Sequence, residues 1–470
     1  MDATALNTIS NWASGKLLRG DPARTVSSVC TDSRKLKAGD LFLALRGEKF
    51  DAHDFVAKAA EQGAAGAVVE KSGDDFLKNL PENFAVIFVA DTLAALQQIA
   101  ANYRRTLPLK AVVITGSNGK TSTKDFTAAV LGERFRTMKT EGNLNNHIGL
   151  PLTILRASAS DEIGVWEIGM NHPGEIAPLA KIAQPDVGVI TSIGVAHIEF
   201  MGSRDAIAQE KGMLAEAVGA DGCVVLPAED DYAESLSKRT NARVIFAGIE
   251  RGEIRASEVA MDVNGSRFVL HDLRDASGEK GVQARIAVPG RHMIRNALLA
   301  VAVGTIFGLS LEECAVGLQK VQLTKGRLEQ KFIRGIRILD DSYNANPDSM
   351  IAALRTLVEM PANRRIAVLG QMNELGAESA RGHSQVGEAA AREKVDFVIT
   401  VGEIAAQIAR SAQQHGVEQA LTVRSTSEAA SLLREIAREG DAVLIKGSRS
   451  AGMETIVEEL EKPAKELAQA

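Results

Sequence analysis

Short apolar runs alternate with helix-compatible segments through the middle of the chain. The runs cover residues 111–114, 165–168, 187–190 and 223–226. Alternation of this kind predicts a parallel sheet whose strands are connected by crossover helices. From residue 261 to residue 288 the pattern changes to alternating apolar and polar residues, with an Asn264-Gly265 turn signal. That change predicts an antiparallel ribbon added to the sheet.

Similar patterns flank this central stretch. Before residue 105, strand-like runs lie at 40–45 and 65–69 and helix-like runs at 55–62 and 93–103, with a linker at Pro108. After residue 325, strand candidates lie at 336–339, 366–369, 397–401 and 443–445, with helical stretches that include 349–358 and 427–439. We expect an α/β protein of three domains: a small α/β domain (1–106), a central parallel-sheet domain (107–324) and a Rossmann-like doubly wound domain (325–470).

The most informative motif joins the run at 111–114 to a helix-compatible segment at 120–131. It reads Gly116-Ser117-Asn118-Gly119-Lys120-Thr121-Ser122. Strand, glycine-rich turn, Lys-Thr and helix are the layout of a phosphate-binding loop (P-loop), in which backbone N–H groups and the helix N-terminus attract an anion. We expect Lys120 to reach the β- and γ-phosphates of ATP and Thr121 to hold Mg²⁺.

This loop is short, because only Ser117 and Asn118 separate the two glycines, where the common P-loop has four residues. The alternative interpretation is an ordinary glycine-rich turn into a helix. Such a turn would explain the glycines, but it does not require Lys and Thr in register at the start of the helix.

Composition restricts the class of protein. The 470 residues are 45% hydrophobic, which suits several ordinary cores, and the net charge of −6 argues against a nucleic-acid partner. No apolar run is long enough to span a bilayer, and the first ten residues do not resemble a signal peptide. The three cysteines are widely spaced, and no coiled-coil seam is evident. We expect a monomeric cytoplasmic enzyme that acts on small molecules.

Polar residues follow the predicted strands of both larger domains. Glu167 ends one central strand and His197 lies just past another, while the C-terminal strands run into 340–344, 370–374, 402–403 and 446–449. Ligands of α/β sheets bind beyond the carboxyl ends of the strands. Since polar loops occur there in any such domain, the pattern alone does not identify a ligand.

Four motifs resemble those of the Mur ligases, the ATP-dependent amino-acid ligases of peptidoglycan precursor synthesis. The shortened P-loop at 116–121 is the first. The segments 141–149 (EGNLNNHIG), 166–176 (WEIGMNHPGEI) and 340–347 (DDSYNANP) resemble the branch of the family that adds D-alanyl-D-alanine. Their order matches over nearly the whole chain.

The resemblance implies a reaction and a division of labour. The N-terminal domain would take the UDP end of the substrate, the central domain ATP, and the C-terminal domain the incoming dipeptide. UDP-N-acetylmuramoyl-tripeptide, D-alanyl-D-alanine and ATP would give UDP-N-acetylmuramoyl-pentapeptide, ADP and phosphate through an acyl phosphate. Most of the work would be positioning and charge neutralisation, which requires cations.

The resemblance also implies catalytic residues besides Lys120. Glu167 would hold Mg²⁺ with Thr121, although it could equally be a strand-end carboxylate that faces water. His197 matches a metal-ligating histidine, and because imidazole is an unusual Mg²⁺ ligand, a second metal position is implied there. Lys211, on the amphipathic stretch 204–217, matches a lysine that the family carbamylates; its ordinary alternative is a solvated helix lysine.

The remaining implied contacts are spread over all three domains. For ATP they are Asn296 (adenine), Arg327 (phosphate, from the interdomain linker), Asp341 (ribose), Tyr343 and Asn344. For the dipeptide carboxylate they are Lys446, Ser448 and Arg449, which could also form a structural turn. For UDP they are Ser33, Arg34, Arg46, Gly47, Asp51 and His53, in segments where Ala52 replaces a more common glycine.

Three alternatives remain open. Another member of the family could add meso-diaminopimelate, lysine or glutamate, but the chain lacks the Asp-Asn-Pro-Arg motif expected of the diaminopimelate-adding branch. Folylpolyglutamate synthase shares the nucleotide-binding core, but the matches at 143–149 and 343–347 favour the cell-wall branch. A non-catalytic nucleotide switch would not need polar clusters in three domains.

Overall fold

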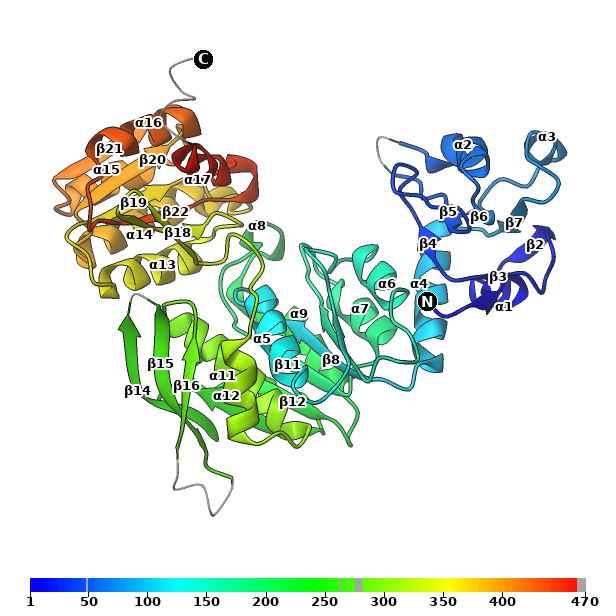
Figure 1. Ribbon diagram of the computed structural model, residues 1–470, viewed down its shortest axis with the longest axis horizontal. Helices are drawn as coiled ribbons and strands as arrows, with labels where there is room; N and C mark the ends of the chain where they lie inside the picture. Colours follow the sequence, from blue (N-terminus) through cyan, green and yellow to red (C-terminus); the bar gives the residue numbers. More distant parts are fainter. Residues whose placement is uncertain (48–49, 263, 275–280, 463–470) are drawn as a thin grey trace.

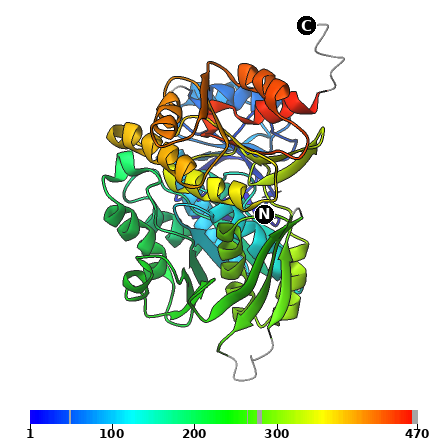
Figure 2. The ribbon, with the colours of Figure 1, turned by 90° about the vertical axis from the view of Figure 1, so that its left-hand side faces the viewer.

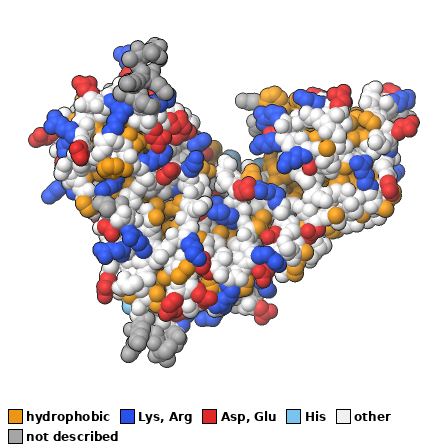
Figure 3. All heavy atoms as spheres, viewed as in Figure 1, with side chains coloured by type: hydrophobic (Ala, Val, Ile, Leu, Met, Phe, Trp, Pro, Cys, Tyr) orange, Lys and Arg blue, Asp and Glu red, His pale blue; other side chains and the backbone are white. Residues whose placement is uncertain are grey.

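The computed structural model describes residues 1–47, 50–262, 264–274 and 281–462. Three α/β parts follow one another along the chain, each with its own main sheet (Figure 1). The C-terminal part lies above the central part, as Figure 2 also shows. The N-terminal part lies on the right in Figure 1. The space-filling view shows an open gap between the N-terminal and C-terminal parts (Figure 3).

The N-terminal part is a small α/β unit. Its elements are β1 Thr4–Ala5, α1 Leu6–Trp12, β2 Lys16–Arg19, β3 Thr25–Val26, β4 Val29–Cys30, β5 Leu41–Leu43, α2 Val56–Glu61, β6 Gly66–Val69, α3 Asp74–Lys78, β7 Ala85–Phe88 and α4 Thr92–Thr106. The main sheet has the order β2-β7-β6-β5-β4, in which only β2 is antiparallel to its neighbour. The Asp91 side chain caps α4 by accepting from the Ala94 N–H. This helix ends just before Pro108 and leads into the central part.

The central part carries the P-loop. Its elements are β8 Lys110–Thr115, α5 Lys120–Leu131, β9 Thr137–Lys139, α6 Gly149–Ile154, β10 Ile163–Glu167, α7 Ile176–Ala183, β11 Val187–Ile190, α8 Ile198–Met201, α9 Arg204–Ala217, β12 Cys223–Pro227, α10 Ala233–Ser237, β13 Arg243–Gly248, β14 Ile254–Asp262, β15 Gly265–Asp272, β16 Val282–Ile286, α11 Arg291–Ile306 and α12 Leu311–Gln319. The sheet order is β16-β15-β14-β13-β12-β11-β8-β10-β9, parallel from β9 to β14 and antiparallel from β14 to β16.

Both faces of the central sheet are covered around β8, β10, β11 and β12, which explains why these strands are continuous buried runs. Val112 and Ile114 of β8 face the apolar cluster that contains residues of α5 and α11. Ala111 and Val113, which point to the opposite face, join a cluster with residues of α7 and α9. The sheet is therefore a fixed platform, and its carboxyl edge holds the P-loop.

The C-terminal part is a doubly wound α/β unit. Its elements are β17 Glu329–Ile333, β18 Ile336–Asp341, α13 Pro347–Glu359, β19 Arg365–Leu369, α14 Ser379–Arg392, β20 Phe397–Val401, α15 Ala406–Gln414, β21 Gln419–Val423, α16 Thr426–Ile436, β22 Ala442–Lys446 and α17 Glu454–Glu461. The sheet order is β17-β18-β22-β19-β20-β21, and only β17 is antiparallel to its neighbour. Helices α13 to α15 cover one face, and α16 and α17 cover the other.

The structure confirms the α/β class and most of the predicted elements. The predicted strands at 187–190 and 397–401 are β11 and β20, and the amphipathic stretch at 204–217 is α9. The antiparallel ribbon is present but begins earlier, at Ile254; residues 263 and 275–280 of the predicted segment lie outside the described residues. Sequence reasoning missed β17 and β21, because these edge strands are only partly buried and lack a continuous apolar run.

Candidate active site

The P-loop lies between β8 and α5 at the carboxyl end of the central sheet. The backbone φ is +149° at Gly116 and +84° at Gly119, values that suit glycine. A Cβ at Gly116 would lie 1.9 Å from Thr191 Oγ1, and a Cβ at Gly119 would lie 2.4 Å from Asn296 Oδ1. Lys120 Nζ donates to the carbonyl oxygen of Gly116 at 2.8 Å, so its side chain folds back over the loop. Asn296, predicted to contact adenine, thus lies directly beside the P-loop.

Glu167 is tied to the P-loop helix. Glu167 is the last residue of β10, and its side chain is buried. Thr121 Oγ1 donates to its Oε2 at 3.0 Å. Asn145 Nδ2 donates to the other oxygen, Oε1, at 2.8 Å. A carboxylate and a hydroxyl in contact beside a phosphate-binding loop supply the oxygen ligands that Mg²⁺ prefers.

Lys211 is a buried amine. It lies on α9 with no exposed surface, and its Nζ has no hydrogen-bond partner among the described residues. Burial first, and then the charge of Lys120, lower the pKa of Lys211 well below its usual value, while Glu210 acts in the opposite direction. Burial also lowers the pKa of Lys120, opposed by Glu167. The charge of Lys120 therefore reaches Lys211, and an anion near these amines would be favourable.

Arg327 connects the C-terminal part to the P-loop. Its Nη2 lies within hydrogen-bond distance of Thr121 Oγ1, at 3.3 Å. Its guanidinium carbon lies 4.0 Å from the centre of the Tyr343 ring, which is cation–π distance. Arg327 Nε is buried and has no hydrogen-bond partner among the residues that the structure describes.

Two further contacts cross between these parts. Asn346 Nδ2, at the N-cap of α13, donates to Asn118 Oδ1 of the P-loop at 2.7 Å. His197 Nδ1 lies 2.6 Å from Oε2 of Glu374, which follows β19. This contact is the main reason that the pKa of Glu374 is lowered. The C-terminal part therefore contacts both the P-loop and the loop after β11.

A second ionic pair lies at the carboxyl end of the C-terminal sheet. Lys446 Nζ donates to Asp341 Oδ2 at 2.6 Å and to the carbonyl oxygen of Asn344 at 2.9 Å. Burial lowers the pKa of Lys446, opposed by Asp341. His292, on α11, is close enough to be influenced by both; burial lowers its pKa to about 4, so its ring is neutral at pH 7.

The other residues predicted for the dipeptide have partners of their own. Ser448 is buried, and its Oγ accepts from the Asn373 N–H at 2.9 Å. Arg449 is exposed, and its Nη1 lies 3.2 Å from Glu454 Oε1. Lys446 is paired with Asp341, the residue predicted to contact ribose. The proposed dipeptide residues and nucleotide residues therefore adjoin each other at this edge.

The residues predicted to bind UDP lie in two segments of the N-terminal part: the loop at 33–34, and residues 46–53, which run into the 3-10 helix Ala52–Phe55. Arg46 lies 3.6 Å from Asp51 and 3.5 Å from Glu70, between their carboxylates. The His53 ring is buried: Nδ1 contacts Asp51 at 2.5 Å, and Nε2 accepts from the Glu70 N–H at 2.9 Å. Arg34 is exposed, and Ser33 adjoins it. Gly47 donates its N–H to the Phe50 carbonyl at 2.9 Å, across residues 48–49, which lie outside the described residues.

Four residues of the site were missed by sequence reasoning. Asn145 and Asn346 stand inside the motifs at 141–149 and 340–347, so their position there was the available signal. Glu374 belongs to the polar segment after the strand at 366–369. His292 had no signal beyond its nearness in sequence to Asn296, because the charged groups that act on its ring, Asp341 and Lys446, are distant in sequence.

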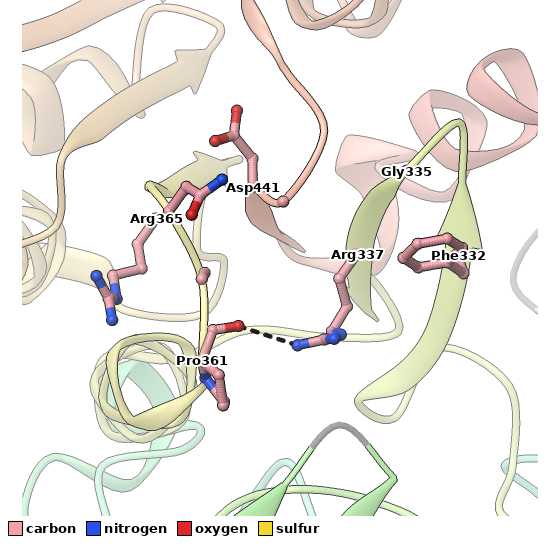
Figure 4. A pocket seen from close by; sticks show the side chains of 9 residues that line it. Phe332, Gly335, Arg337, Pro361, Arg365 and Asp441 are labelled. Atoms are coloured by element: carbon pink, nitrogen blue, oxygen red, sulfur yellow. Dashed lines mark hydrogen bonds between the residues drawn. The ribbon is translucent and has the colours of Figure 1, made fainter.

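A hollow in the C-terminal part lies outside this site (Figure 4). Its volume is about 520 Å³, and its lining includes Phe332, Arg337, Arg365 and Asp441. Arg337 and Arg365 are near the starts of the parallel strands β18 and β19, whereas Lys446 ends β22. The hollow is therefore at the amino edge of the sheet, opposite the edge that faces the P-loop.

The described residues contain neither a cluster of metal-ligating side chains nor a membrane-spanning helix. No group of three or more His, Cys, Asp or Glu side chains is placed there to hold a metal ion. None of the helices within the described ranges is both long enough and apolar enough to cross a membrane.

Family models match all three parts of the chain. The Mur ligase middle domain matches residues 114–304, and the Mur ligase glutamate ligase domain matches residues 326–449. The Mur ligase family catalytic domain matches residues 25–104. The first two matches cover the P-loop, Glu167, Lys211 and Arg327.

Known proteins resemble the chain over nearly its full length. The UDP-N-acetylmuramoyl-tripeptide–D-alanyl-D-alanine ligase of Bacillus subtilis (strain 168) is 36% identical in an alignment of 462 residues that covers 97% of this chain and 98% of the relative. A crystal structure of MurF from Acinetobacter baumannii has a TM-score of 0.88 and 32% identity, covering 98% and 100% of the two chains. MurF ligase from Thermotoga maritima in complex with ADP has a TM-score of 0.82 and 26% identity, covering 94% and 98%.

Proposed function

The chain belongs to the Mur ligase family, and we propose that it joins D-alanyl-D-alanine to UDP-N-acetylmuramoyl-tripeptide with ATP as the energy source. The products are UDP-N-acetylmuramoyl-pentapeptide, ADP and phosphate, a late step in peptidoglycan precursor synthesis. The observation that carries this proposal is the 36% sequence identity, over nearly the full length of both chains, to a relative named for this reaction. The P-loop, Glu167 and Arg327 supply a site with the chemistry that such a reaction needs.

The site fits activation of a carboxylate by phosphorylation. An amine does not displace hydroxide from a carboxylate at neutral pH, whereas phosphate leaves readily from an acyl phosphate. Lys120, Arg327 and the N-terminus of α5 converge where the γ-phosphoryl group would be transferred, and they neutralise its charge. Because the contact between Arg327 and Thr121 joins two parts of the chain, the placement of the C-terminal part against the P-loop completes this set of cations.

Mg²⁺ fits the residues beside the P-loop. Thr121 and Glu167 would hold it, and when bound it supplies charge neutralisation to the phosphate oxygens. The buried contact between hydroxyl and carboxylate supports this assignment, because it holds two oxygen ligands side by side next to the P-loop. His197 is proposed for a second metal position, where its Nδ1 already contacts Glu374.

We propose that Lys211 carries a carbamate. The neutral amine nitrogen would form a bond to the carbon of CO₂ and release one proton, which converts a neutral amine into an anion; starting from the ammonium form, two protons are released in all. Complete burial and the lack of a hydrogen-bond partner among the described residues support this, since an unprotonated amine is the form that reacts. The resulting anion would be stabilised by the nearby charge of Lys120.

The proposal assigns the three domains different tasks. Residues 1–106 bind the UDP end, with Ser33, Arg34, Arg46, Gly47, Asp51 and His53. Residues 107–324 bind ATP, with the P-loop and Asn296. Residues 325–470 bring Arg327, Asp341, Tyr343 and Asn344 to the nucleotide and Lys446, Ser448 and Arg449 to the dipeptide. A single chain supplies every proposed residue, so we propose that the enzyme acts as a monomer, in the cytoplasm where ATP is available.

A donor screen tests this function. The protein would be incubated with ATP, Mg²⁺ and UDP-N-acetylmuramoyl-tripeptide, and phosphate release would be followed with D-alanyl-D-alanine, L-lysine, meso-diaminopimelate or glutamate. We expect release only with D-alanyl-D-alanine. Release with a free amino acid instead would favour another ligase of the family, and donor-independent hydrolysis would favour a nucleotide switch. A matched assay with folate and glutamate covers folylpolyglutamate synthase.

A further inference from the structure

Asp125 joins the P-loop helix to the segment that leads into the C-terminal part. It lies on α5, four residues after Thr121, so both side chains project from the same side of the helix. Only 1% of Asp125 is exposed. Its Oδ2 accepts from both the N–H and the hydroxyl of Thr324, at 2.9 and 2.8 Å.

The other oxygen of Asp125 is held by lysines. Lys139 Nζ donates to Oδ1 at 2.6 Å, and Lys124 Nζ lies 3.4 Å away. Lys124 is itself only 1% exposed, so the Asp125–Lys124 pair is shielded from water. Such a buried, fully engaged carboxylate fixes the direction of its hydrogen bonds, because any rotation would leave a buried charge without its partner.

The linker after Thr324 is bound to the C-terminal part instead. The carbonyl oxygen of Gly326 accepts from the Tyr343 N–H at 3.2 Å, and the Leu328 N–H donates to Asp341 at 3.3 Å. Gly326 has a φ of +69°, and a Cβ there would lie 3.1 Å from the nitrogen of Tyr343. Within the three residues from Thr324 to Gly326, the chain therefore passes from hydrogen bonds with the central part to hydrogen bonds with the C-terminal part.

Arg327 is the next residue after this segment. Its side chain returns to α5, where Nη2 meets Thr121 one helical turn before Asp125. We propose that Asp125 is a positioning residue: it holds Thr324 against α5 so that Arg327 reaches the transferred phosphoryl group. The buried Nε of Arg327, unpartnered among the described residues, is a donor that a phosphate oxygen would satisfy.

This inference rests on the proposed function for its chemistry, so the test measures two quantities. ATP affinity and donor-dependent turnover would be compared in the wild type, Asp125→Asn, Arg327→Ala and the double variant. We expect Asp125→Asn to lower kcat on the order of 10- to 100-fold and to weaken ATP binding, with little change in KM for the dipeptide. In the Arg327→Ala background the same change should cost less than about twofold, because the residue being positioned is gone.

A matched control separates positioning from general damage. Asp186 also accepts from a backbone N–H (Ala111) and a lysine (Lys110), both at 2.8 Å. It directly precedes β11, at the amino edge of the central sheet, whereas the P-loop is at the carboxyl edge. Asp186→Asn should leave the ATP affinity and kcat near the wild-type values. Should Asp125→Asn fail to fold, Thr324→Val, which removes only the hydroxyl's bond to Asp125, takes its place in the cycle.

The outcomes are distinct. A loss that depends on Arg327 supports the positioning role. Equal losses with and without Arg327, or no loss at all, would overturn it. If the wild type releases no phosphate with any donor, the proposed function fails, and the cycle in ATP affinity still decides whether Asp125 acts through Arg327.

Discussion

The hydroxyl of Thr121 donates to the carboxylate of Glu167 across 3.0 Å, so the first turn of α5 is tied to the end of β10. Since β10 pairs directly with β8, the P-loop and the proposed metal-binding carboxylate are held by neighbouring strands of one buried sheet. The geometry that ATP and Mg²⁺ would require is therefore set by the core of the central part.

Replacing Glu167 by Gln tests this metal site. The variant keeps the shape of the side chain but loses the charge, and the Asn145 amide can turn to restore its hydrogen bond. We expect the protein to fold, while the Mg²⁺ concentration for half-maximal turnover rises by about tenfold or more. A Mg²⁺ titration of phosphate release measures the shift, and an unchanged curve would restrict Glu167 to a structural role.

Replacing Lys120 by Ala tests the P-loop. The variant removes a cation whose interaction with the γ-phosphoryl group strengthens during transfer, so kcat should fall on the order of 100- to 1000-fold. The thermal midpoint should not fall, because Lys120 is partly buried and the desolvation of its charge opposes folding. Lys110→Ala, which removes a largely exposed lysine at the start of β8, is the control and should remain active. Wild-type turnover in folded Lys120→Ala would remove this lysine from the mechanism.

Replacing Lys211 by Ala tests the carbamate. We expect turnover to be lost and to return in part with acetate or formate at high concentration, because a diffusible carboxylate can replace the missing anion. Lys238→Ala, at a surface position, should change stability by no more than about 0.5 kcal/mol and keep its activity. Full activity of Lys211→Ala would contradict the carbamate, as would wild-type activity that is insensitive to removal of CO₂ and bicarbonate.

His292 should make stability depend on pH. Its folded pKa is about 4, below the value of 6.5 for a free histidine, so the unfolded chain binds more protons between these values. The stabilisation is complete above pH 6.5 and is lost as the pH falls toward 4. His292→Asn should therefore lose less free energy of unfolding than the wild type between pH 7 and pH 5, by about 2 kcal/mol. Equal losses in both proteins would show that His292 is not the group responsible; His415→Asn is the control.

The fold was accessible from the sequence where both faces of an element are buried. Strands such as β11 lie between two helical layers and appear as continuous apolar runs. Edge strands give no such signal: β17 and β21 each expose part of one face and were missed. The ribbon's start at Ile254 was also missed, because its alternation begins within a polar stretch.

The site was accessible where local sequence determines local shape. The P-loop needs glycine at Gly116 and Gly119 for reasons that are visible in the backbone, so its motif predicts its structure. Contacts between distant segments could not be predicted in this way. The pairing of His197 with Glu374 depends on how the C-terminal part meets the central part, a relationship that no local pattern records.

The most direct test of the central claim follows an oxygen atom. UDP-N-acetylmuramoyl-tripeptide labelled with ¹⁸O in its terminal carboxylate would be incubated with the protein, ATP, Mg²⁺ and D-alanyl-D-alanine, and both products would be analysed by mass spectrometry. If the carboxylate is phosphorylated before the amine attacks, one ¹⁸O moves into phosphate while the pentapeptide product forms. Pentapeptide formation with unlabelled phosphate would contradict the acyl phosphate, and phosphate release without pentapeptide would contradict the ligase itself.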